Sequence, residues 1–316
     1  MALIADALPV KEQGLRRPRL SAGRVGAVLL AVIALPCFLT LPWSVQYYDH
    51  QRLTEAQQSQ PPTLGEPMGT DTHGRPLLWR CLLGGAISLG VGLSAAVLAM
   101  VIGTAWGGLA GYVGGRVDSG MMRVVDVLYG LPYILLVVLV DMALQPVLVA
   151  GARLVFAADI ATGLGRVLTL MLAIGAVSWL TMARVIRGQV LSLRGQPFVE
   201  AARAVGVGPM RLMGVHLLPN LIGPMIVYST LTVPAAILQE SFLSFLGIGI
   251  QDPLPSWGNL ASDGLRALHT LAMGSANVEW WLLFFPCLLL GLTLMGLNFV
   301  GDALRERFDP RSTRQR

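Results

Sequence analysis

The most restrictive feature of the sequence is a run of 35 residues, 81–115, that contains no charged side chain. A helix that crosses a bilayer needs about 20 mostly apolar residues. The run is therefore long enough for one long membrane helix, or for a helix with a lead-in at the membrane surface. Charged residues make up only 13% of the chain, which is about half of what soluble domains carry. We predict an all-α membrane protein, because a helix satisfies its own backbone groups in lipid.

Five other apolar stretches have the length and composition of membrane helices, so the sequence predicts six spans. These stretches are residues 25–41, 121–140, 167–183, 221–246 and 280–301. The first follows several arginines, which fits either a cleaved signal peptide or an uncleaved anchor. No clear A-x-A cleavage site follows it, so we interpret residues 25–43 as a membrane helix. The polar residues 44–80 predict an extramembrane segment, and residues 141–166 predict a loop with an amphipathic or re-entrant piece.

The basic residues indicate how the six spans are oriented. With six spans, both ends of the chain lie on one side of the membrane. If that side is the cytoplasm, the inner segments contain 17 of the 23 Lys and Arg residues and the outer segments contain six, as the positive-inside rule predicts. Residues 1–24 and 302–316 then form cytoplasmic tails, and a loop at residues 188–218 is also cytoplasmic. The net charge of +5 reflects this topology, so no nucleic-acid partner is expected.

A stripe of glycines runs through the second span. Gly103, Gly107, Gly111 and Gly115 recur every four residues and make three overlapping GxxxG steps. On a membrane helix, a face of this kind lets another backbone approach closely. We expect tight helix packing within this subunit or against a partner. The alternative is that these glycines have no specific role, because glycine is common in membrane helices.

A short polar helix is predicted between the fourth and fifth spans. Pro197 suits the first position of a helix, and Gly206 suits the left-handed residue that closes one. The predicted helix, residues 197–205, is nine residues long, and isolated helices shorter than about 12 residues are marginal in water. It must therefore dock against another surface.

Two surfaces could receive this helix. Ala201 and Ala202 have little side-chain bulk, so the backbone could sit deep in the groove of a partner protein. Glu200 and Arg203 could then make polar contacts at the edge of that groove. The other possibility is a helix that lies on the lipid head groups. The physical pattern alone leaves both open.

Acidic residues fall within or beside the expected spans. A charge at the centre of a membrane helix costs about 3 kcal/mol, so such a residue has a buried partner or a function. Glu240 lies late in the fifth span, where we consider both a hydrogen-bonding role and a role in a transport pathway. Asp126 is expected near the cytoplasmic mouth, and Asp141 at the outer end of the third span.

Signatures of enzymes and metal sites are absent from the sequence. The chain has no HExxH, GxSxG or GxxxxGK[ST] motif and no CxxC pair. We therefore expect no catalytic residue, no bound metal and no ATP site on this chain. An intramembrane enzyme is therefore the first alternative that the sequence disfavours. A secondary transporter is the second alternative, but the sequence shows no convincing internal repeat and few acidic residues for an ion relay.

Several motifs resemble those of a known family. EAARAVG at residues 200–206, followed after ten further residues by LLPN, resembles the EAA loop of type I ABC importer permeases. Four more segments are similar to those of C-type permease subunits of bacterial dipeptide and oligopeptide importers. They are LGEPMGTDTHGR at 64–75, AGYVGGRVDSGMMRVVDVLYGLP at 110–132, SFLSFLGIGIQDPLPSWGN at 241–259 and NFVGDALRERFDPR at 298–311. The resemblance covers most of residues 64–312.

The resemblance implies a type I ABC importer permease fold in residues 81–301. It also implies a multi-pass location in the bacterial inner membrane, with residues 44–80 in the periplasm. In that family the EAA loop forms a coupling helix that sits in a cleft of an ATPase subunit. The residues that match or flank this motif are Pro197, Glu200, Ala201, Ala202, Arg203 and Gly206.

The implied partners are a second permease, two ATPase subunits that carry ATP and Mg, membrane lipid, and a periplasmic or lipid-anchored substrate-binding protein that delivers peptide. This chain itself would need no cofactor. Pro76, Trp79 and Ala86 depart from the usual pattern. Residues 141–166 also look longer than is usual in the family. These departures lie mostly on the outer side and leave the cargo open between dipeptides, longer peptides, nickel chelates and other solutes.

Overall fold

A computed structural model describes residues 20–50, 58–271 and 279–308. The described chain is helical apart from its turns and one isolated β-bridge, between Thr70 and Pro76. Its elements are α1 (Leu20–Leu39), α2 (Leu41–Tyr47), α3 (Leu77–Val113), α4 (Gly115–Tyr129), α5 (Tyr133–Arg153), α6 (Ala158–Leu193), α7 (Pro197–Ala204), α8 (Pro209–Arg211), the π-helix η2 (Leu212–Leu217), α9 (Leu218–Phe245), α10 (Trp257–Leu271) and α11 (Trp280–Phe308). Most of the predicted basic tails, residues 1–19 and 309–316, lies outside the described residues.

Six helical stretches of the described chain are long and apolar enough to cross a membrane, as the sequence predicts. They are Ala22–Leu39, Leu77–Val113, Tyr133–Arg153, Ile160–Leu193, Pro209–Phe245 and Trp280–Phe308. The prediction of an all-α protein with six membrane helices is therefore confirmed.

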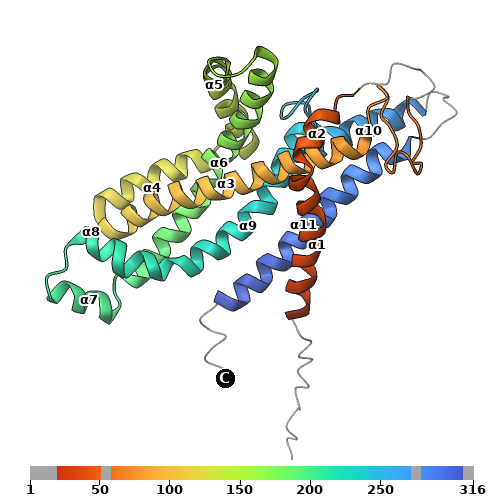
Figure 1. The fold of residues 1–316 in the computed structure, drawn as a ribbon. Helices are drawn as coiled ribbons and strands as arrows, with labels where there is room; N and C mark the ends of the chain where they lie inside the picture. The colour runs from red at the N-terminus through yellow and green to blue at the C-terminus, as the bar shows by residue number, and fades with distance from the viewer. Residues whose placement is uncertain (1–19, 51–57, 272–278, 309–316) are drawn as a thin grey trace, which may run out of the picture.

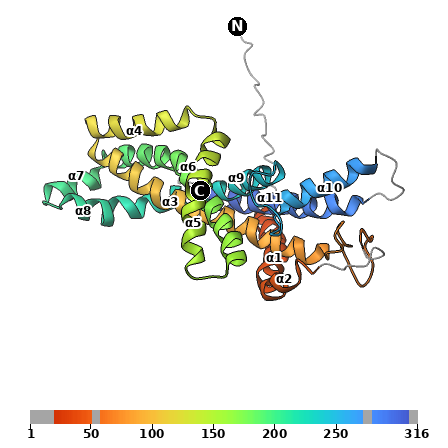
Figure 2. The same cartoon turned by 90° about the horizontal axis from the view of Figure 1, so that it is seen from above.

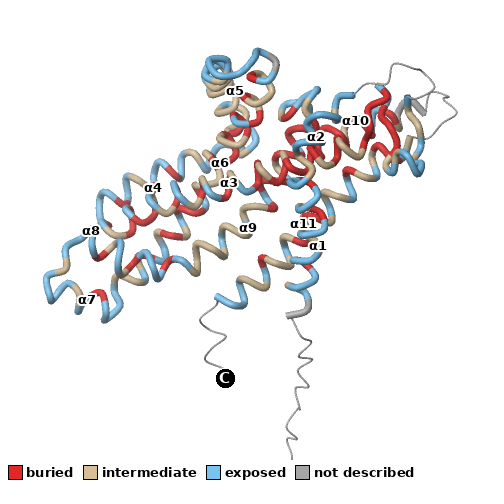
Figure 3. The backbone as a smooth tube through the Cα atoms, in the orientation of Figure 1, coloured by how far each residue is buried: buried red, intermediate tan, exposed pale blue. Residues whose placement is uncertain are grey.

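The scaffold consists of three long helices, α3, α6 and α9, which pack side by side (Figure 1). The view from above shows α5 lying across one flank of this group (Figure 2). The α7 and α8 segment lies at one end of the long helices, and α10 lies at the other. Burial is concentrated along α3 and α6 and around α10, whereas α5 and α7 are largely exposed (Figure 3).

Helices α1 and α11 form a second, antiparallel pair. A Cβ added at Gly23 of α1 would meet Ala303 of α11, and one added at Gly26 would meet Phe299. A Cβ at Gly223, early in α9, would come within 3.9 Å of Phe308. The described ends of α1 and α11 therefore lie at the same end of the scaffold as α7, as expected for a chain with six spans.

The third span differs from the prediction. Instead of one helix over residues 121–140, the chain forms α4, breaks at residues 130–132, and continues as α5. Pro132 explains the break, because a proline disfavours helical conformation in the residue before it and has no N–H to donate. The third membrane helix is therefore α5, which leaves Asp126 in α4 outside it.

The loop predicted at residues 141–166 is also wrong. Helix α5 continues to Arg153, and α6 begins at Ala158 after a short turn. Asp141 lies inside α5 and does not mark its end. Charged residues such as Asp141 and Arg166 lower the local hydropathy, but they do not break the backbone hydrogen bonds of a helix. Both helices therefore extend through charged positions.

Three of the four stripe glycines lie where α3 meets α6. A Cβ at Gly103 would collide with Met182, one at Gly107 with the backbone of Ala183, and one at Gly111 with the backbone of Arg187. The fourth, Gly115, lies beyond the end of α3 with a φ of +59° and open space around it. The stripe therefore continues through three positions, and the fourth supplies a turn.

A matched pair of alanine substitutions tests this contact. Gly107→Ala places a methyl group against the α6 backbone, which cannot retreat as a flexible side chain could. We expect a loss of about 1–3 kcal/mol in stability, the usual cost of overpacking. The neighbouring Gly108 has no atom within 4 Å of an added Cβ, so Gly108→Ala should be neutral or slightly stabilising, since alanine favours a helix interior over glycine. Thermal unfolding of the purified chain in detergent checks both, and equal melting temperatures would contradict the packing argument.

Candidate functional site

The α7 helix begins at Pro197, as its sequence predicts, and ends at Ala204, one residue before the predicted end. Pro197 occupies the first turn, and Glu200 completes it. At the other end Gly206 has a φ of +84°. Its N–H donates to the Arg203 carbonyl at 2.9 Å, and the Val207 N–H donates to the Ala202 carbonyl at 3.0 Å. This pair of bonds is a Schellman motif, which closes the helix after eight residues.

One face of α7 is anchored to its own chain. Val199 is fully buried in a cluster with Ile186 and Val190 of α6 and with Leu212 and Leu217 of η2. Ala202, one turn later, packs against the same cluster. The anchor ties the short helix both to the end of the fourth span and to the beginning of the fifth.

The opposite face of α7 is largely exposed, although the Arg203 guanidinium lies 6.0 Å from the centre of the Tyr112 ring of α3. Glu200, Ala201 and Arg203 are exposed. Phe198 is 40% exposed and Val205 is 86% exposed. Met210, at the start of α8, is 87% exposed. These residues combine small, apolar and charged side chains on a helix at the end of the molecule opposite α10. Such a surface indicates a protein partner.

Helix α4 is tied to α6 by two ion pairs near this end. Asp118 accepts hydrogen bonds from Arg187 at 2.5 and 2.6 Å. These bonds hold the pKa of the Asp118 carboxyl below its ordinary value, because they favour its charged form. Asp126 pairs with Arg184 at 2.7 Å, and the Arg184 guanidinium lies 4.0 Å from the centre of the Tyr129 ring. Asp126 is thus an exposed partner of α6.

Glu240 is fully buried and has a set of hydroxyl partners. Its carboxyl oxygens accept hydrogen bonds from Ser88 at 2.7 Å, Ser244 at 2.8 Å and Ser241 at 3.3 Å. The Ser244 hydroxyl also accepts a bond from the Ile250 N–H at 2.9 Å. Glu240 therefore joins α3, the end of α9 and the turn beyond it, which is the hydrogen-bonding role considered for this residue.

A second buried polar network lies at the end of the scaffold opposite α7. Arg80 is fully buried and donates to Asp252 at 2.9 Å. Asp71 accepts from the N–H and the side chain of Arg75, at 2.8 and 2.7 Å. The network fastens the 58–76 segment to the beginning of α3 and to the loop before α10. The role of Arg80 could not be inferred from the sequence, because an arginine directly before an apolar run is typical of a residue that borders a membrane helix.

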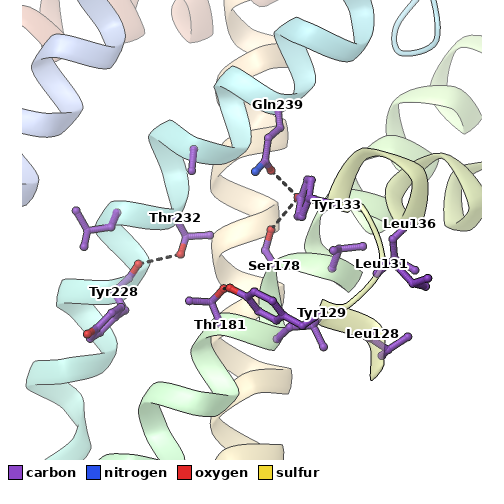
Figure 4. Close-up of a pocket in the computed structure, with 14 residues that line it drawn as sticks. Leu128, Tyr129, Leu131, Tyr133, Leu136, Ser178, Thr181, Tyr228, Thr232 and Gln239 are labelled. Atoms are coloured by element: carbon purple, nitrogen blue, oxygen red, sulfur yellow. Dashed lines mark hydrogen bonds between the residues drawn. The ribbon is translucent and has the colours of Figure 1, made fainter. Parts of the chain in front are cut away.

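A cavity of about 510 Å³ opens between α9, α6 and the junction of α4 and α5 (Figure 4). Its lining residues are Leu128, Tyr129, Leu131, Tyr133, Leu136, Val177, Ser178, Leu180, Thr181, Tyr228, Leu231, Thr232, Ala235 and Gln239. None of them is charged, and Glu240 is not among them. These positions cannot be recognised in the sequence, because scattered hydroxyl and amide groups within apolar spans have no motif of their own.

Among the described residues, no group of three or more His, Cys, Asp or Glu side chains is placed to hold a metal ion. The glycine stripe, the α7 surface and Glu240 lie in three separate regions of the fold, so they do not form one site. The arrangement offers a docking surface at one end and an uncharged cavity along the helices.

Comparisons with known proteins agree with this arrangement. A family profile described as "Binding-protein-dependent transport system inner membrane component" matches residues 103–314. The dipeptide transport system permease protein DppC of Bacillus subtilis is 44% identical over 84% of this chain and 74% of its own length. The oligopeptide transport system permease protein OppC of Escherichia coli K12 is 40% identical over 90% of this chain and 86% of its own.

Among solved structures, the fold is similar to a chain of the MetNI methionine ABC transporter in an inward-facing conformation. The TM-score is 0.51 and the identity 19%, and the match covers 74% of this chain and 98% of that chain. At this identity, the likeness describes the fold alone.

The role of Glu240 can be tested through stability. Glu240→Leu leaves the hydroxyls of Ser88 and Ser244 without their acceptor, so we expect a loss of about 1–3 kcal/mol. Glu240→Gln keeps one acceptor oxygen and the side-chain shape, so the loss should be smaller. Thermal unfolding in detergent compares the two variants. A loss for Gln as large as that for Leu would mean that these hydrogen bonds to hydroxyls do not explain why the carboxyl group is there.

Proposed function

This chain belongs to the family of inner-membrane components of binding-protein-dependent transport systems, and from that premise we propose that it is a permease subunit of an ATP-driven peptide importer. The dipeptide and oligopeptide permeases to which it is 38–44% identical support the peptide cargo. The single observation that carries the proposal is the exposed, capped α7 helix. It is too short to be stable alone, and Glu200, Ala201 and Arg203 on its outer face are exposed.

The partners follow from this surface and from the family. Two ATPase subunits bind ATP and Mg, and one of them receives α7 in a cleft. A second permease completes the translocation pathway, and a binding protein delivers the peptide at the end of the molecule where α10 lies. In this arrangement α7 lies in the cytoplasm, and the segment at residues 58–76 faces the periplasm.

The anchoring of α7 supports a mechanism of coupling. Val199 lies in one cluster with residues of α6 and η2, so a force on α7 reaches the fourth and fifth spans together. When the ATPase subunits close on ATP, the cleft moves α7, and these spans rotate to change which side the pathway faces. Coupling of this kind requires that α7 make different contacts in the two states.

Two substitutions on α7 test the coupling. Gly206→Pro cannot keep a φ of +84° and removes the N–H that bonds the Arg203 carbonyl, and Glu200→Lys reverses an exposed charge. We expect both chains to insert normally but to lose ATPase copurification or peptide uptake by at least about tenfold, which corresponds to about 1.4 kcal/mol of binding. Reconstituted complexes measure both quantities.

Gly208→Ala is the matched control, since Gly208 lies in the same loop with a φ of −66° and open space around it. It should assemble and transport as the unmodified chain does. Normal assembly and uptake in both α7 variants would contradict the proposed role of the helix.

A further inference from the structure

The cavity beside α9 is a groove whose shape suits an extended chain. Five of its lining residues form one stripe of α9 that runs from Tyr228 through Thr232 to Gln239. These eleven steps of helix correspond to about 16 Å. A fully extended peptide advances about 3.3–3.6 Å per residue, so the groove matches a chain of four or five residues. Its volume of about 510 Å³ is within the range of small-molecule sites.

The groove has hydrogen-bonding groups that the protein only partly uses. Tyr133 donates to the Gln239 carbonyl oxygen and lies 3.5 Å from the Ser178 hydroxyl, and Figure 4 shows these three side chains pointing toward one another. Tyr129 and Thr181 are joined at 3.1 Å. The amide nitrogen of Gln239 has no hydrogen-bond partner in the part of the chain that the structure describes. The hydroxyl of Tyr228 is likewise unpaired within it.

These groups argue against a lipid tail as the occupant. Hydroxyl and amide groups that face hydrocarbon without partners cost free energy, and a lipid tail would leave the Tyr228 hydroxyl and the Gln239 amide nitrogen in that state. A peptide main chain offers an N–H and a C=O at every residue, and both need partners inside a membrane. No charged residue lines the groove, so it holds no fixed charge that would select peptide side chains of one sign.

We propose that this groove binds the main chain of a short extended peptide in transit, through hydroxyl and amide groups that do not read the peptide's sequence. The inference rests on the proposed function, since it names the place where this permease contacts its cargo. The second permease would close the open side. Gln239 and the tyrosines at 133 and 228 are the positions that we expect to contact the peptide.

Site-specific photo-crosslinking in the reconstituted importer tests the proposal. A benzophenone amino acid replaces Tyr228 in one complex and Thr232 in another, and the complexes receive a radiolabelled tetrapeptide with ATP and the binding protein. Leu238 is the control, because it lies on the same helix, is 54% exposed and does not line the groove. We expect labelled peptide to be attached at both groove positions but not at position 238, and excess unlabelled peptide to prevent it.

The outcomes separate the two ideas. If the unmodified complex imports peptide but the groove positions attach only to lipid or to the second permease, the groove is not the peptide site and the inference is wrong. If the unmodified complex shows no peptide uptake at all, the proposed function is wrong. Attachment of peptide at all three positions to the same degree would also overturn the inference, because it would show no preference for the groove.

A blocking substitution provides an independent measurement. Ala235 lines the groove and is exposed, so Ala235→Phe fills the groove without entering the packed interior. We expect uptake to fall by at least about tenfold. Ala105→Phe, at an exposed alanine of α3 outside the groove, is the matched control and should keep its uptake. Equal uptake by the two variants would count against the groove.

Discussion

The close contact between α3 and α6 is the constraint on which the rest of the structure depends. In lipid the hydrophobic effect does not draw helices together, so packing must come from van der Waals contact at short range. Gly103, Gly107 and Gly111 allow that contact, because any side chain there would meet α6. Helix α9 then packs against both partners. The three helices form one unit, and both the α7 helix and the groove take their positions from it.

The proposed force transmission follows from how this unit ends. Helix α6 continues past the groove to Leu193, and α7 begins four residues later. Along the same stretch, Arg187 holds Asp118 and Arg184 holds Asp126. A displacement of α7 therefore reaches α4 through two charged contacts, and the end of α4 forms one edge of the groove. Under the proposed function, the ATPase subunit and the peptide therefore both act on α6.

How much the sequence could predict depends on the kind of signal. The six spans follow from apolar length, and the ends of α7 follow from Pro197 and Gly206, whose backbone preferences are local properties. The extension of α5 through Asp141 was missed, because hydropathy responds to charge while helices respond to backbone hydrogen bonds. The break before Pro132 was missed, because the apolar residues on both sides of this proline form one continuous hydrophobic run. The groove could not be predicted, since its tyrosines and Gln239 meet only when three helices pack.

The fold also separates polar groups that hold it together from those that are left available. The three hydroxyls on Glu240 and the carboxylate on Arg80 are buried contacts that join distant parts of the chain. Leaving such a group unpaired in this setting is costly, and the carboxyl oxygens of Glu240 are all engaged, whereas Arg80 bonds through Nη2 while its Nε and Nη1 atoms have no hydrogen-bond partner among the described residues. The unpaired donor of Gln239 is different, because it lies one residue from Glu240 but faces the open groove. Two neighbouring residues of α9 therefore have opposite environments. The carboxyl group of Glu240 is hydrogen-bonded within the chain, whereas the amide nitrogen of Gln239 can still donate a hydrogen bond to a molecule in the groove.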